Sequence, residues 1–268
     1  MVGDPARLVD LAVVAEQSGW DGFFLWDHLQ LDAASRPAVH DPWVLLGAIG
    51  GRTNKLRLGT LVTPVPRRRP WKLAREVITL DHLTGGRAVL GVGLGVPPDI
   101  EYGAFGEPTD PRTHAAMLDE ALPLLDGFLR GDPVKHDGTH YRIDAHLNPP
   151  AVQDPRPPIW VAATLGRRRP LERARRWEGV FPLSSSGPLT PSELRGLVNT
   201  LDPPAGYEIV TMFHPDAAVE ELAAAGATWL IDGPEPDEAF AAVRERVELG
   251  PVRTGRPTLI PAPSRPPR

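Results

Sequence analysis

Residues 59–95 read GTLVTPVPRRRPWKLAREVITLDHLTGGRAVLGVGLG, which predicts a strand, a loop, a helix and a second strand. The first apolar run stops at Pro64, and Pro70 can begin a helix because a first-turn residue makes no helical use of its N–H. Apolar side chains then recur at helical spacing, and the Gly-Gly pair at 85–86 is a typical helix end. Residues 88–90 return as a buried strand and run into a glycine-rich turn. The stretch is therefore a β/α unit whose last strand ends where a ligand could approach the backbone closely.

The same alternation of strand and helix continues along the whole chain. Strands are expected near residues 22–26, 56–62, 88–92, 158–163, 179–183, 207–212 and 228–232. Helices are expected near residues 4–19, 42–51, 70–82, 112–130, 168–177, 191–200, 215–225 and 236–249. Short buried strands that alternate with amphipathic helices are typical of a parallel sheet covered by helices.

The composition excludes several classes of protein. Of the 268 residues, 41% are apolar, and the net charge of −5 gives no reason to expect a nucleic-acid partner. The absence of cysteine excludes disulfides, thiolate metal ligands and a cysteine nucleophile. No apolar run approaches the roughly 18 residues of a membrane span, and the histidines lack metal-ligand spacing. We therefore expect a cytoplasmic protein with no metal and no membrane partner.

Asp27 and His28 follow the apolar run 23–26, so they lie at the carboxyl end of a predicted strand. In β/α barrels the active site is built at this end. A histidine there can move a proton near neutral pH, and an adjacent carboxylate can orient its ring. The alternative is that His28 caps the strand by bonding a backbone carbonyl. The residues alone leave both roles open.

The glycine run 91–95 invites comparison with the dinucleotide-binding fingerprint. That motif needs a third glycine two residues after the second, with a helix that opens at once. Here Val96 follows the run and two prolines come next, so a Rossmann-type site is disfavoured. Asp99 and Glu101 are acids close to the run, but their spacing does not select either as a functional group.

Two arginine clusters could bind anions. Thr164, Leu165 and Gly166 follow a predicted strand, and the arginines 167–169 open the next helix. Helix-start amides together with guanidinium groups suit a phosphate. The arginines 67–69 could likewise attract an anionic substrate. In both places the alternative is a solvated surface, and for residues 67–69 an exposed loop is the favoured interpretation.

Taken together, the stretch 59–95 and the WDH sequence at 26–28 resemble the bacterial-luciferase-like flavin oxidoreductases, and the resemblance runs from about residue 4 to residue 250. That superfamily of (β/α)8 barrels includes monooxygenases that use flavin mononucleotide (FMN) and enzymes of the deazaflavin F420. The resemblance implies one α/β domain over residues 1–250, a luciferase-like TIM barrel. Asp-Gly between extended runs predicts a hairpin excursion within residues 131–150.

The strand count leaves an eight-stranded barrel one strand short. A helix stands first, and only residues 1–3 precede it, so the barrel is expected to lack its first strand in this chain. A start of the coding sequence placed too late is the favoured explanation, and a barrel open at that point is the other. The edges left by the gap favour association into a homodimer. Residues 251–268 are rich in proline and arginine and are expected to form a disordered tail.

The resemblance also implies roles for individual residues. It makes His28 catalytic, close to the reactive face of the cofactor ring, with Asp27 as its carboxylate partner. It implies a cis peptide bond at Leu61–Val62 and a ring contact from the hydroxyl of Thr63. The candidate cofactor-binding residues are Thr60, Leu61, Val62, Thr63, Gly93, Leu94, Gly95 and Asp99 for the ring, and Thr164, Leu165 and Gly166 for the phosphate.

Two cofactors fit the resemblance about equally well, F420 and FMN. With reduced FMN from a separate reductase, the protein would activate oxygen and oxygenate a small organic substrate. With F420 it would transfer hydride, and His28 would stabilise charge or move a proton. The Asp27-His28 pair favours F420, whereas Val96 stands where sugar-phosphate-oxidising relatives have a glutamate. The alternative to an enzyme is a non-catalytic or degenerate relative that binds flavin or nothing.

Overall fold

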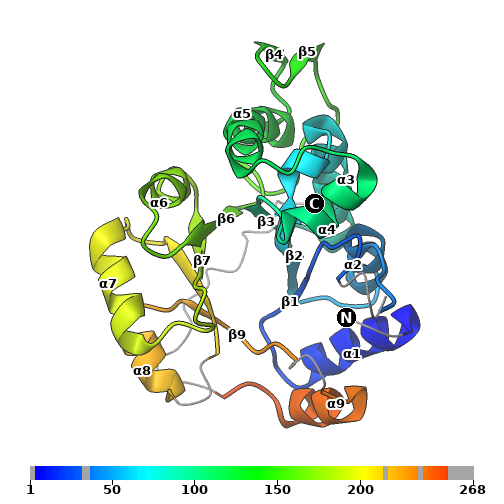
Figure 1. Ribbon diagram of the computed structural model, residues 1–268. Coiled ribbons are helices and arrows are strands. Elements are labelled where there is room, and N and C mark those ends of the chain that lie inside the picture. The colour runs from blue at the N-terminus through cyan, green and yellow to red at the C-terminus, as the bar shows by residue number, and fades with distance from the viewer. Residues whose placement is uncertain (1–3, 32–36, 214–216, 235–237, 253–268) are drawn as a thin grey trace.

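The computed structural model describes residues 4–31, 37–213, 217–234 and 238–252. Seven parallel strands form one curved sheet in the order β1-β2-β3-β6-β7-β8-β9, and helices cover its outer face (Figure 1). The strands are β1 (Gly22–Leu25), β2 (Arg57–Pro64), β3 (Ala88–Gly93), β6 (Ile159–Thr164), β7 (Gly179–Leu183), β8 (Glu208–Met212) and β9 (Trp229–Ile231). All seven predicted strands are confirmed, and they form an incomplete α/β barrel.

The helices follow the strands along the chain. They are α1 (Pro5–Gln17), α2 (Pro42–Gly50), α3 (Pro70–Thr84), α4 (Pro98–Glu101), α5 (Pro111–Arg130), α6 (Arg168–Ala174), α7 (Pro191–Leu201), α8 (Val219–Ala224) and α9 (Phe240–Leu249). Two short 3-10 turns, η1 (Val65–Arg67) and η2 (Gly103–Phe105), lie in the loops after β2 and after α4. The last two helices begin about four residues later than predicted, and α4 was not predicted.

Local chemistry explains where the helices begin and end. Asp4, Asp41 and Asp110 each accept a 2.9 Å hydrogen bond from a first-turn amide, and a proline follows each of them. An aspartate cap of this kind satisfies an amide that has no partner inside the helix. Gly85 ends α3 in the left-handed conformation with φ of +63°, which a side chain would strain.

The interior of the barrel is filled by an aromatic cluster. The rings of Phe24 and Trp160 lie 5.3 Å apart, and Trp229 lies 5.5 Å from Trp160 and 5.8 Å from Phe24. Alternate residues of each strand point inward, so the cluster collects one side chain from each of β1, β6 and β9. The remaining core side chains lie between the sheet and the helices.

The two outer strands of the sheet meet through side chains. In the described part of the chain, no backbone pairing joins β1 to β9, and the edge contact of Phe24 with Trp229 bridges them. Outside this seam α1 and α9 lie side by side (Figure 1). The Arg7 guanidinium lies 4.1 Å from the Phe240 ring centre, and Trp20 Nε1 donates a 2.9 Å bond to the carbonyl of Val247.

The predicted hairpin is confirmed. Strands β4 (Val134–Asp137) and β5 (Arg142–Ala145) pair antiparallel and project beyond α5, away from the barrel (Figure 1). Glu120 of α5 accepts backbone amides of His140 and Tyr141, which fastens the hairpin to that helix. Residues 1–3, which precede the first helix, lie outside the described residues. So do residues 253–268, which make up most of the tail that was expected to be disordered.

Two classes of feature are absent from the described residues. None of their helices combines the length and the apolar character needed to cross a membrane. No group of three or more histidine or acidic side chains among them could hold a metal ion.

Candidate functional site at the mouth of the barrel

Strand β2 carries an irregularity at the mouth of the barrel. Its pairing with β3 slips between Thr60 and Thr63, and the peptide bond at Leu61–Val62 is cis, as predicted. The Thr63 hydroxyl donates to the Thr60 hydroxyl at 3.0 Å, which in turn donates to the carbonyl of Gly91 at 3.1 Å. Both threonines are fully buried. The Thr63 hydroxyl therefore stabilises the irregular strand, and its expected contact with a cofactor ring stays a prediction.

Small residues on three adjacent strands form a shelf just inside the mouth. A Cβ atom added to Gly93 of β3 would lie 2.6 Å from Val62 Cγ2 and 3.5 Å from Ala162 Cβ, so the three residues are neighbours. Val62 and Ala162 are only partly buried, and they pack on the interior aromatic cluster. Exposed apolar side chains lie just beyond the strand ends: Trp26 after β1, Val96 after β3, and Phe213 after β8. This low apolar shelf with an apolar rim fits a flat, ring-shaped cofactor.

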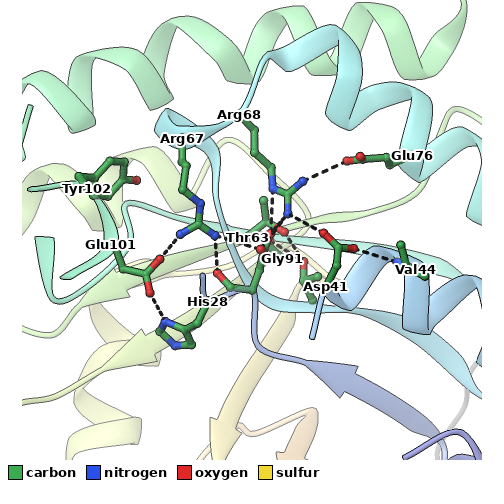
Figure 2. A network of polar contacts seen from close by, with 12 residues as sticks. His28, Asp41, Val44, Thr63, Arg67, Arg68, Glu76, Gly91, Glu101 and Tyr102 are labelled. Atoms are coloured by element: carbon green, nitrogen blue, oxygen red, sulfur yellow. Dashed lines mark hydrogen bonds and ion pairs between the residues drawn. The ribbon is translucent and has the colours of Figure 1, made fainter. Parts of the chain in front are cut away.

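His28 is held by a carboxylate that the sequence did not select. Its Nδ1 lies 2.6 Å from Oε1 of Glu101, whose side chain is fully buried in α4 (Figure 2). The expected partner, Asp27, is instead bound by two guanidinium groups. Arg67 reaches Asp27 Oδ1 at 3.0 Å, and Arg68 Nε reaches Oδ2 at 2.9 Å. The predicted Asp27–His28 pair is therefore corrected to a Glu101–His28 pair.

Arg67 connects the two carboxylates. It forms an ion pair with Glu101, and it also donates to the backbone carbonyl of Asp27 at 2.8 Å (Figure 2). Arg68 continues the network to Glu76 of α3 at 3.3 Å. The side chains of Arg67 and Arg68 are 6% and 17% exposed, so the expectation of an exposed loop is wrong for them. The two arginines can be buried because the carboxylates of Asp27, after β1, and Glu101, in α4, neutralise them.

The surroundings of His28 favour its neutral form. Burial lowers its pKa, and the positive charge of Arg67 lowers it further, while Asp27 opposes the shift. Removing a histidine from water disfavours the charged ring, and a nearby cation acts in the same direction. Burial and Arg67 thus favour the neutral imidazole, which is the form that can accept a proton.

The segment 97–102 links His28 to the glycine run. Glu101 holds the histidine, and the hydroxyl of the adjacent Tyr102 donates to the carbonyl of Leu94 at 2.5 Å. Gly95 has φ of +84°, so the run turns sharply at that point. Asp99 is exposed on α4, and Glu101 is the acid that reaches His28. A cofactor contact from Asp99 stays a prediction.

The expected phosphate-binding region is only partly available. The Leu165 amide donates to the carbonyl of Leu183 at 2.8 Å, so it is already committed to the neighbouring strand end. Thr164 is exposed, and Gly166, with φ of +73°, has open space around it. Arg168 pairs with Glu172 at 2.7 Å on the surface of α6. Contacts of Thr164 and Gly166 with a phosphate stay predictions.

A small recess of about 10 Å³ lies beside His28. It is lined by Trp26, His28, Leu31, Val39, His40 and Leu45. The rings of Trp26 and His28 meet edge to face, 6.2 Å apart. The described lining is mostly apolar, with two imidazoles as its polar groups.

Known proteins are similar to this chain in sequence and in fold. The chain is 37% identical over 169 residues to the F420-dependent glucose-6-phosphate dehydrogenase of Nakamurella multipartita. The aligned stretch covers 60% of this chain and 47% of that dehydrogenase. The chain thus spans about half the length of the curated relatives it matches. The F420-dependent tetrahydromethanopterin reductase of Methanopyrus kandleri superposes with a TM-score of 0.61 at 22% identity, over 74% of this chain and 57% of the reductase.

The EDTA monooxygenase of Chelativorans sp. BNC1 superposes with a TM-score of 0.68 at 20% identity, over 83% of this chain and 58% of that enzyme. At such identities the two superpositions show a common fold. The sequence profile described as "Luciferase-like monooxygenase" matches residues 2–188, which is well over half of the chain. The chain therefore belongs to the luciferase-like monooxygenase family of flavin- and F420-dependent oxidoreductases.

Proposed function

We propose that this protein is an oxidoreductase that uses F420 for hydride transfer to or from a small organic substrate. The observation that carries the proposal is His28, an imidazole that is held by a carboxylate beside an apolar shelf and whose pKa is lowered by burial. F420, when bound, supplies the acceptor or donor of hydride. The residues Val62, Gly93 and Ala162 would carry the ring, because they form the low shelf at the strand ends.

The protein's own part in the reaction is proton handling and water exclusion. In the oxidative direction, Nε2 of His28 accepts the proton of a substrate hydroxyl. The carbon that bears this hydroxyl would give up a hydride to the bound F420. In the reverse direction the same nitrogen returns the proton to the carbonyl oxygen. The exposed apolar side chains at the strand ends would hold the organic part of the substrate and keep water away from the reacting atoms.

The ion pairs of Arg67 and Arg68 bear on the class of substrate. Arg67 and Arg68 are paired with Asp27 and Glu101, so neither guanidinium is available for a phosphate. The glycine run is followed by Val96 in place of an acid. We therefore propose a largely apolar substrate, although the curated relatives are named for glucose 6-phosphate.

Val96 also favours a second candidate, an FMN monooxygenase with a separate reductase, because it removes the acid expected of the best-known F420 dehydrogenases. Fluorescence titration of the full chain with F420 and, separately, with FMN distinguishes the two. Binding of F420 alone supports hydride transfer, whereas preference for FMN supports oxygenation. Binding of neither cofactor contradicts both candidates and supports a non-catalytic relative.

A further inference from the structure

We propose that Glu101 is a positioning residue that fixes His28 in the tautomer with its proton on Nδ1, with Arg67 keeping Glu101 ionised. The inference rests on the proposed function, since it makes Nε2 of His28 the nitrogen that handles the substrate proton. It adds two residues, Glu101 and Arg67, whose role is to set the tautomer of His28.

The tautomer follows from the charge state of Glu101. Its carboxyl group is fully buried, and it forms an ion pair with the nearly buried guanidinium of Arg67. An adjacent guanidinium favours the ionised form of a carboxyl group, and an ionised carboxylate can only accept hydrogen bonds. The 2.6 Å contact therefore requires that Nδ1 of His28 donates. In the neutral ring, Nε2 is then unprotonated and is left as the acceptor.

Glu101 acts through His28 and cannot reach a substrate itself. One of its oxygens accepts from His28 and the other from Arg67, and no part of the side chain is exposed. His28, in contrast, is 25% exposed and lines the recess. Among the described residues, no protein group bonds its Nε2. The imidazole is thus held on one side and open on the other.

The charged groups around His28 form one network. Asp27 and Glu101 are its nearest carboxylates, and Arg67 and Arg68 neutralise them. Glu76 and Asp41 also lie within reach of Arg68, at 3.3 and 4.0 Å. Tyr102 lies on the same segment as Glu101, and His40 lies across the recess. Loss of one member of this set leaves its partner uncompensated beside His28. Removing Arg67 and removing Glu101 should therefore move the pKa of His28 in opposite directions.

The first test is nitrogen NMR of uniformly ¹⁵N-labelled full chain without any cofactor at neutral pH. The His28→Gln variant assigns the His28 signals by their loss. A neutral His28 with the proton on Nδ1 supports the proposal. A neutral ring with the proton on Nε2, or a doubly protonated ring at pH 7, overturns it. Because no cofactor is present, the result stands whether or not the protein proves to bind F420.

The second test is titration of His28 in two variants. Arg67→Met should raise the pKa of His28 by about one pH unit or more, and Glu101→Gln should lower it, since an opposite or like charge within about 4–6 Å shifts a pKa by this order. Shifts in the same direction, or no shifts, would overturn the proposal. If either variant fails to give a folded spectrum, the tautomer measured in the unmodified chain decides the matter.

A matched control is present in the same chain. His136 Nε2 lies 2.9 Å from Oε1 of Glu120 in the hairpin region, far along the chain from the mouth. Glu120→Gln removes the carboxylate partner of His136 and should leave the titration of His28 as it is. A change at His28 in this control would show that the shifts arise from general loosening of the structure, which contradicts a specific role for Glu101.

Discussion

Gly93 is the residue at which the proposed cofactor shelf can be tested most directly. A valine there would place its Cβ 2.6 Å from Val62 Cγ2, so the shelf would be raised and its neighbours displaced. We predict that Gly93→Val lowers cofactor affinity at least tenfold and costs about 1–3 kcal/mol of stability through overpacking. Fluorescence titration gives the affinity, and urea unfolding gives the free energy of unfolding.

Gly47 offers the matched control for this change. It lies on α2, and an added Cβ would meet no atom within 4 Å. Gly47→Val should therefore bind the cofactor with the affinity of the unmodified chain. Equal affinity in both variants would show that the ring does not lie on the shelf.

At the scale of single residues, the sequence located the site but not its partners. Asp27 and His28 were found because they follow an apolar strand. The bonds of Arg67 to Asp27 and Glu101 span 40 and 34 positions of the chain. No local pattern indicates which distant carboxylate an arginine will meet, so residues 67–69 resembled a solvated loop. Glu101 was visible as an acid, but only its position in the folded α4 distinguishes it from Asp99.

At the scale of elements, Glu16 ties the end of α1 to the turn before β2. It accepts the backbone amides of Asn54, Lys55 and Leu56 at 2.6–3.2 Å. Burial raises its pKa, but these amides lower it more, so the net pKa lies below the ordinary value of 4.5. A carboxylate of this kind stabilises the fold above pH 4.5 and loses that contribution as the pH falls through its lowered folded value.

We therefore predict that Glu16→Gln lowers the free energy of unfolding at pH 7 by about 1 kcal/mol. The loss of stability below pH 4.5 should also become less steep, because one titrating group has been removed. Urea unfolding across the acid range measures both effects. Glu245→Gln, an exposed change on α9, is the control, and an equal effect there would contradict a special role for Glu16.

The elements themselves were largely predictable because their signals are local. Aspartate caps, prolines in the first turn and glycines after the last turn lie within a few residues of each helix boundary. The same holds for the Asp-Gly hairpin. The short α4 was missed because Pro97 precedes it, Pro98 begins it, and its four residues are too few to show a helical period.

At the scale of the whole molecule, Trp229 holds the two ends of the sheet together. It is 9% exposed and contacts Phe24 across the seam and Trp160 at the centre. We predict that Trp229→Ala costs about 3–5 kcal/mol in free energy of unfolding, the usual range for a buried tryptophan. Guanidinium unfolding followed by circular dichroism measures the loss.

Trp26→Ala is the comparison for this prediction. Trp26 is 38% exposed at the mouth, so its removal should cost well under half as much. Equal losses in the two variants would contradict a special role for the seam. The predicted homodimer is tested with the same preparations by sedimentation, and it stays a prediction.

The open seam gives the barrel a mechanical character of its own. A closed ring of strands behaves as a hoop, in which every strand restrains all the others. Here β6 lies in the middle of the sheet with three strands on either side, so the strands at the two ends can move relative to each other. Across the seam, the described residues meet through Phe24 with Trp229 and through α1 with α9. The two ends of the sheet are therefore joined by side chains and helices, where a closed barrel would have a continuous ladder of backbone hydrogen bonds between strands.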